Sequence, residues 1–123
     1  FTNEQNKIIS YHFYKFKKLA ESLDLFTCDL PVNKKNYNFV SAFAGEYIND
    51  VAQYIINKTN CDVCMLINLN NKRVYFRKNK KVDLDLGKFA SKTCNGGGHE
   101  YAAGGELNDI ILTLSKKFVP IDG

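Results

Sequence analysis

The chain has 123 residues, of which 45% are hydrophobic and 24% charged, a composition typical of one folded domain and not of a disordered chain. With 17 basic against 13 acidic residues the formal net charge is +4, which permits a polyanionic partner without requiring one. No apolar run approaches the roughly 20 residues that span a bilayer and no segment resembles a signal peptide, so we expect a cytoplasmic protein with no membrane contact. Because the sequence begins at Phe1 and not at Met, we expect a piece of a longer protein.

Apolar residues recur at helical spacing near the start of the chain, which predicts an amphipathic helix over about residues 3–25. His12 falls on its apolar face, where a packed structural role is the simplest interpretation. The remaining expected elements are, in order, a polar loop at 31–36, a strand at 38–43, a helix at 46–58, strands at 61–69 and 72–78 around a tight turn at Asn70–Asn71, a helix from Asp83 or Asp85 to about Cys94, and a helix capped by Asn108 or Asp109.

The alternation of side chains assigns faces to these elements. Val74 and Phe76 are expected to face the core from strand 72–78, with Arg73, Tyr75 and Arg77 on the opposite side. The other positions expected on a buried face are Val63, Met65, Ile67 and Leu69 in the preceding strand and Ile110, Ile111, Leu114 and Phe118 in the last helix. This order of helices and strands predicts an α+β domain with a small central sheet flanked by helices.

Four cysteines raise the question of a metal or redox site. Cys61 and Cys64 have the spacing of zinc ligands, but such sites usually need a second close pair. Residues three apart on a strand also point to opposite faces, and Cys28 and Cys94 are isolated. We expect buried free thiols in a reducing cytoplasm, with a zinc-binding interaction domain kept as an alternative.

The segment Cys94-Asn95-Gly96-Gly97-Gly98-His99-Glu100-Tyr101-Ala102-Ala103-Gly104-Gly105 is the strongest local feature. Three successive glycines lack Cβ atoms, so the backbone can adopt positive φ and a ligand can approach its N–H groups. A helix that started at His99 would add its positive end, and Ala102 and Ala103 suit a short helix packed against the sheet. The alternative is a flexible loop between two helices.

Gly-Gly-Gly-His followed two residues later by Ala-Ala-Gly resembles the signature of the DHHA1 domain, the substrate-binding domain of DHH-family phosphoesterases. Arg77 stands where the family has the arginine of a Ser-x-Arg pattern, and Tyr75 replaces the serine. The resemblance covers about residues 37–107. It implies that residues 31–123 form the DHHA1 domain and that residues 1–30 are a connector helix from a preceding DHH domain.

The resemblance also implies a function. The parent protein would be a manganese-dependent hydrolase of phosphoester bonds, such as an exonuclease, with Mn²⁺ held by Asp and His residues of the DHH domain. This chain has no Asp-His-His motif, so it is expected to bind substrate without cutting it. The expected partners are single-stranded nucleic acid, a short oligonucleotide or a nucleotide phosphate, and the preceding DHH domain; a homodimer is left open. The related C-terminal tRNA-binding and dimerisation domain of alanyl-tRNA synthetases is the alternative.

The expected substrate-binding residues are Gly96, Gly97, Gly98 and His99 of the glycine loop, together with Asn95 and Arg77. The planar guanidinium of Arg77 matches two phosphate oxygens at once, although a solvated charge at a strand edge is the plain alternative. Asn95 either braces the loop or ends the preceding helix. Secondary candidates are Arg73, Tyr75 and Lys78, with Lys80 and Lys81 extending the positive patch to steer an anion.

Overall fold

One mixed sheet organises the chain in the computed structural model, which describes residues 15 and 17–121. Within these residues the sheet has seven strands in the order β5-β6-β4-β3-β2-β1-β7. The strands are β1 (Phe26–Val32), β2 (Lys35–Phe43), β3 (Val63–Asn68), β4 (Arg73–Lys78), β5 (Gly97–Gly98), β6 (Ala102–Glu106) and β7 (Val119–Pro120). The helices with defined ends are α2 (Ile48–Thr59), α3 (Leu86–Thr93) and α4 (Asp109–Ser115).

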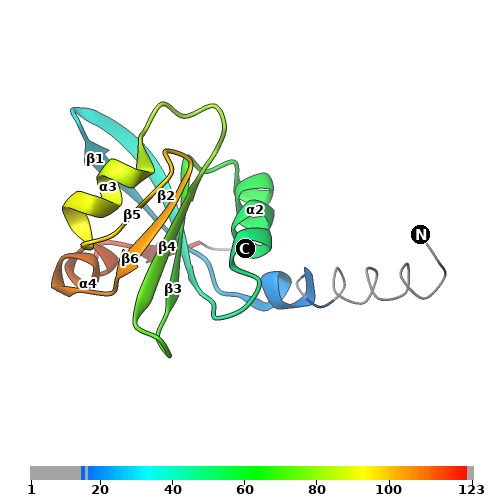
Figure 1. Ribbon diagram of the computed structural model, residues 1–123. Coiled ribbons are helices and arrows are strands. Elements are labelled where there is room, and N and C mark those ends of the chain that lie inside the picture. Colours follow the sequence, from blue (N-terminus) through cyan, green and yellow to red (C-terminus); the bar gives the residue numbers. More distant parts are fainter. Residues whose placement is uncertain (1–14, 16, 122–123) are drawn as a thin grey trace, which may run out of the picture.

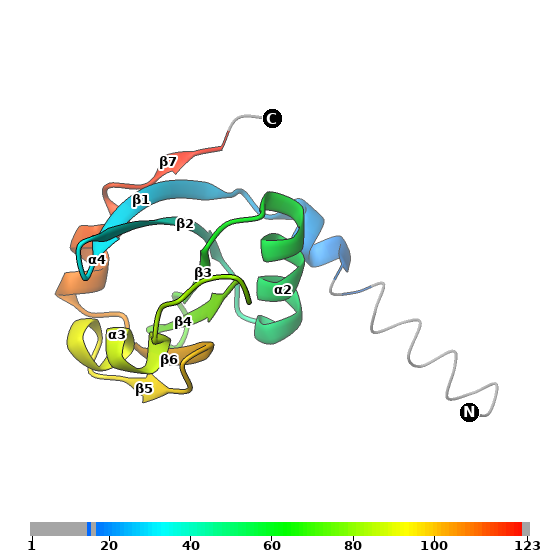
Figure 2. The same cartoon turned by 90° about the horizontal axis from the view of Figure 1, so that it is seen from above.

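Helices cover both faces of this sheet (Figure 1). Seen from above, the strands follow a curve, with α3 and α4 on its inner side and α2 on its outer side (Figure 2). β2 and β3 are parallel and α2 connects them, whereas the other neighbouring strands pair antiparallel. The architecture is α+β, which confirms the fold class expected from the sequence.

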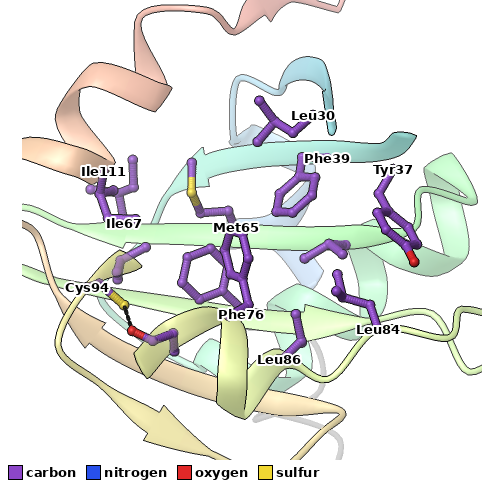
Figure 3. Close-up of a cluster of buried hydrophobic side chains, with 14 residues drawn as sticks. Leu30, Tyr37, Phe39, Met65, Ile67, Phe76, Leu84, Leu86, Cys94 and Ile111 are labelled. Atoms are coloured by element: carbon purple, nitrogen blue, oxygen red, sulfur yellow. Dashed lines mark hydrogen bonds between the residues drawn. The ribbon is translucent and has the colours of Figure 1, made fainter. Parts of the chain in front are cut away.

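The core has two parts because the central strands are buried on both faces. On the inner side, Phe89 of α3 packs against Phe76 of β4 with ring centroids 5.2 Å apart and against Phe39 of β2 at 5.7 Å. Figure 3 shows this cluster, which also holds Met65 and Ile111. On the outer side, α2 buries its apolar stripe, namely Val51, Ala52, Ile55 and Ile56, against the other face of the sheet.

Several elements follow the sequence pattern closely. α2, β3, β4, α3 and α4 form where they were expected, with Asp85 and Asn108 as the N-caps of α3 and α4. Two positions were placed on the wrong face: Ile110 is 51% exposed on α4, and Leu69 is 61% exposed in the turn after β3. That turn spans residues 69–72 and is braced by the side chain of Asn68, which accepts from the N–H of Asn70.

The beginning of the sheet differs from the expectation. The expected helix at about 3–25 lies largely outside the described residues, whose helical part ends at Ser22. The expected loop at 31–36 is instead a hairpin between β1 and β2, turned by Asn33 and Lys34 with φ of 51° and 69°. Pro31 suggested a loop, but it is tolerated because β7 pairs only with Phe26 and Thr27, which leaves the rest of β1 as an edge. None of the described helices has the length and apolar character needed to cross a membrane.

The cysteines are free thiols, and three of them, Cys61, Cys64 and Cys94, are buried while Cys28 is half-buried. Cys61 precedes β3, so strand alternation does not separate it from Cys64, and both pack in the outer cluster beside α2. The expectation that they point to opposite faces was therefore wrong. Burial, and to a smaller degree the neighbouring Cys61, raises the pKa of the Cys64 thiol well above its ordinary value.

A pH effect on stability follows from the buried thiol. Because burial raises the pKa of Cys64, the folded protein retains this proton at a pH where the unfolded chain, with an ordinary value of 9.0, has lost it. The free energy of unfolding is therefore expected to fall as pH rises above about 9, by up to about 1.4 kcal/mol per pH unit from this group. Urea unfolding of the parent and of Cys64→Ala at several alkaline pH values measures it. An equally steep decline in the variant would contradict the assignment.

Candidate functional site

The glycine-rich segment forms a β-hairpin in place of the expected short helix after His99. Gly97 and Gly98 of β5 pair with Gly104 and Ala103 of β6, and β6 pairs along β4 from Arg77 to Arg73. The physical reason is that β4 would otherwise be an open edge with unpaired backbone groups, and the segment from Ala102 satisfies them. No helix N-terminus therefore lies at the glycines, and that part of the expected phosphate site was wrong.

The glycines of this hairpin differ in what they are needed for. A Cβ on Gly96 would overlap the carbonyl of Gly104, and one on Gly105 would overlap Cys94. Gly98 has a φ of +142°, and its Cβ would lie 2.7 Å from the carbonyl oxygen of Ala102. Gly97 has no atom within 4 Å of the same position and no positive φ. A Cβ on Gly104 would lie 2.9 Å from the carbonyl oxygen of Val74. Packing thus requires glycine at 96, 98, 104 and 105 but not at 97, where the missing side chain leaves open space.

Gly96→Ala is expected to lower the free energy of unfolding by about 1–3 kcal/mol, because the added methyl must displace the β6 backbone. Urea denaturation of the parent and the variant measures this loss. The matched control is Gly97→Ala in the same loop, which should change stability much less because its Cβ meets nothing. Equal losses of stability at the two positions would contradict this difference in packing between Gly96 and Gly97.

A cavity of about 350 Å³ lies beside the hairpin, between it, β4 and the first half of α2. This α2–β4 cavity is lined by Ile48, Asn49, Ala52, Tyr75, Phe76, Arg77, Gly97, Gly98, Ala102 and Ala103. The cavity brings Tyr75 and Arg77 of β4 close to Gly97 and Gly98, two of the three loop glycines, which lie about 20 residues later in the sequence. Its volume lies at the lower end of the range for small-molecule sites. The sequence did not predict that α2 lines this cavity, because the spacing of Ile48 and Ala52 indicated only core positions of an amphipathic helix.

Arg77 is the charged side chain among the described residues that line the α2–β4 cavity. Arg77 is half-buried and forms no salt bridge with any described carboxylate. The N-cap of α2, Tyr47, makes no side-chain cap hydrogen bond. The N–H groups of the first turn therefore keep a partial positive charge beside Asn49, which the acidic Asp50 in the same turn offsets in part. Both features favour an anion at the rim, whereas the floor is formed by alanine, glycine and aromatic side chains.

The tip of the hairpin carries two exposed aromatic rings. His99 and Tyr101 stack with centroids 5.7 Å apart and planes 11° from parallel, and Tyr101 is 55% exposed. The N–H of His99 donates to Ala102 and the N–H of Gly96 donates to Ala90. Two of the N–H groups expected to bind phosphate are thus used within the fold. Because hydrogen bonding alternates along an antiparallel pair, the N–H of Gly97, which pairs with Gly104, is expected to bond to β6 as well, which leaves that of Gly98. The sequence had not singled out Tyr101.

The other candidate residues lie outside the α2–β4 cavity. Asn95 follows the C-cap of α3 with a φ of 52°, and its amide donates to Glu106 at 3.5 Å, so it braces the loop. Arg73 starts β4 opposite Glu106, at the far end of the strand from Arg77. Lys78 lines a second cavity, and its backbone N–H donates to Tyr101.

A metal site needs several ligating side chains close together. Across residues 15 and 17–121, no three His, Cys, Asp or Glu side chains gather closely enough to hold a metal ion. Among these residues there is thus no third side chain to complete a zinc site built on Cys61 and Cys64.

Comparison with known proteins identifies a fold but no family. No family model matches the chain, and no curated protein matches it. Among solved structures, the crystal structure of an uncharacterized protein from Helicobacter pylori G27 superposes with a TM-score of 0.56 over 73% of this chain, with 18% sequence identity. The match covers 27% of that protein, so this chain spans about a quarter of its length. At this identity the likeness shows a shared fold and nothing about activity.

Proposed function

We propose that this chain binds the phosphate and base of a nucleotide in the α2–β4 cavity. The observation that carries the proposal is the convergence of Arg77 with Gly97 and Gly98 around one cavity. Arg77 has no described carboxylate partner, and glycine at 97 has no packing reason in the fold. An unpaired guanidinium beside an open backbone is suited to a phosphate group.

The residues that line the cavity offer a nucleotide two kinds of contact, one for its base and one for its phosphate. The apolar floor near Ala102 and Tyr75 suits the flat face of a base, which gains from contact with aromatic and aliphatic groups. The guanidinium of Arg77 can donate two parallel hydrogen bonds to phosphate oxygens at the rim. The Gly98 N–H is expected to point outward, since His99 already bonds to β6 and hydrogen bonding alternates along an antiparallel edge.

This binding role is the one that the resemblance to DHHA1 domains implies. We assign residues 31–123 to a substrate-binding domain and residues 1–30 to a connector from a DHH domain. That preceding domain would hold Mn²⁺ and hydrolyse the phosphoester bond, while this chain positions single-stranded nucleic acid or nucleotide. The Helicobacter pylori protein carries a similar fold within a longer chain, which is in line with this arrangement. A cytoplasmic location is part of the proposal and agrees with free thiols.

Binding of thymidine 5′-monophosphate and of thymidine by the 123-residue chain tests the proposal. The nucleotide is expected to bind more tightly by about 1–3 kcal/mol, the worth of a charged hydrogen bond, because Arg77 contacts only the phosphate. Isothermal titration calorimetry at low salt measures both affinities. Equal affinities for the nucleotide and the nucleoside, or no binding of either, would contradict the proposed phosphate site.

A further inference from the structure

The polar surface beside α2 extends beyond the α2–β4 cavity. A second cavity of about 400 Å³ lies between the C-terminal half of α2 and the segment that follows β4. It is lined by three lysines, Lys78, Lys80 and Lys81, and by amide side chains that include Asn57, Asn60 and Asn79. No carboxylate is among its lining residues. We call it the lysine cavity.

The two cavities lie one after the other between α2 and the chain segment formed by β4 and the residues that follow it. On α2, Asn49 lines the first cavity, while Gln53 and Asn57 line the second. Gln53 and Asn57 follow Asn49 by four and eight residues, so all three lie along one side of the helix. On the facing wall, Arg77 lines the first cavity and the adjacent Lys78 lines the second. From Asn49 to Asn57 the helix rises roughly 12 Å, which leaves room for more than one phosphate group.

The charges of the lysine cavity are not used within the fold. Lys78, Lys80 and Lys81 form no salt bridge with any carboxylate of the described residues. The amides, by contrast, are held in place: Asn79 donates to Asn60 at 3.2 Å and to the carbonyl of Cys61 at 3.3 Å. The C-terminus of α2 contributes roughly half a negative charge nearby, and three ammonium groups exceed it.

We propose that the lysine cavity is a second subsite, which binds the phosphate backbone of a single-stranded nucleic acid whose terminal nucleotide occupies the α2–β4 cavity. This rests on the proposed function and specifies its substrate as an oligonucleotide. Lysines supply sequence-independent attraction to the phosphates, and the fixed amides supply hydrogen bonds. The strand is single because the first cavity takes an unpaired base, which a duplex keeps stacked.

The test compares the parent with a triple variant, Lys78→Gln, Lys80→Gln and Lys81→Gln. The control variant is Lys35→Gln, Lys116→Gln and Lys117→Gln, which removes the same charge from exposed positions outside both cavities. The probes are thymidine 5′-monophosphate and oligothymidylates of increasing length, titrated at several salt concentrations. Circular dichroism confirms that each variant folds.

The parent and the control are expected to bind longer oligonucleotides more tightly than the monophosphate, and the triple variant is expected to lose this gain. Its slope of log affinity against log salt should be shallower by about two, since each neutralised phosphate of a single strand contributes roughly 0.7. Over a fourfold rise in salt, the affinity of the parent should then fall roughly twentyfold further than that of the variant. Monophosphate binding should be unchanged.

The second subsite would be overturned by an absence of any gain with length in the parent, by an equal loss in the control variant, or by a loss of monophosphate binding in the triple variant. Competition by duplex DNA or polyglutamate as effective as that by the single strand would also overturn it. If the parent bound neither monophosphate nor oligonucleotide, the proposed function itself would fail.

Discussion

Gly97→Val is expected to abolish nucleotide binding while the variant stays folded. The Cβ of residue 97 would project into open space at the α2–β4 cavity, where it meets no protein atom within 4 Å. Gly97 lies in β5 without a positive φ, and valine suits a strand. The side chain therefore costs the fold little but occupies the space through which a phosphate would reach the backbone.

The measurement is a titration of thymidine 5′-monophosphate with Gly97→Ala and Gly97→Val, with urea unfolding of each variant. Binding should weaken with alanine and disappear with valine, in the order of side-chain size, while the free energy of unfolding changes by less than about 1 kcal/mol. Unchanged affinity in a folded Gly97→Val protein would show that no ligand approaches this position, and the loop would be structural only.

Arg77→Ala is expected to weaken nucleotide binding by about 1–3 kcal/mol, or roughly tenfold to a hundredfold, because it removes a charged hydrogen-bond donor from the rim. Arg77→Lys should recover only part of this loss, since an ammonium group cannot reproduce the two parallel hydrogen bonds of a guanidinium. Binding of the nucleoside, which has no phosphate, should be the same in all three proteins.

Arg73→Ala provides the matched control for Arg77→Ala. Arg73 is the other arginine of the chain and belongs to the same strand, but it lines neither cavity. Its removal lowers the net charge by the same amount, so a general electrostatic effect would appear in both variants. Equal losses in Arg73→Ala and Arg77→Ala would contradict a phosphate contact specific to Arg77.

The sequence was informative where one periodicity dominated. Strand 72–78 alternates so clearly that the opposite faces of Val74 and Arg77 followed directly, and Arg77 does line a cavity. Asp85 was one of two expected caps, and its carboxylate accepts from the N–H of Lys88 at 3.1 Å. Both features depend on residues close together in the sequence, which is where patterns are most reliable.

The hairpin of β5 and β6 was not predictable by the same means. Gly97, Gly98 and Ala102 carry little local preference for a strand, and they become strands because β4 offers a free edge. The cavity itself depends on where α2 crosses the sheet, a tertiary feature with no sequence period. For the same reason the sequence did not separate Gly97, with its open space, from Gly96, whose glycine is required by packing.

Backbone amide NMR shifts recorded during a titration with thymidine 5′-monophosphate test the central claim most directly. The account predicts that the largest shifts cluster at Gly97, Gly98, Tyr75 and Arg77, with Asn49 at the start of α2 also affected. Amides of α4, on the opposite side of the sheet, should not move. Saturable shifts centred on α4 or β7, with none at Gly97, Gly98 and Arg77, would contradict it.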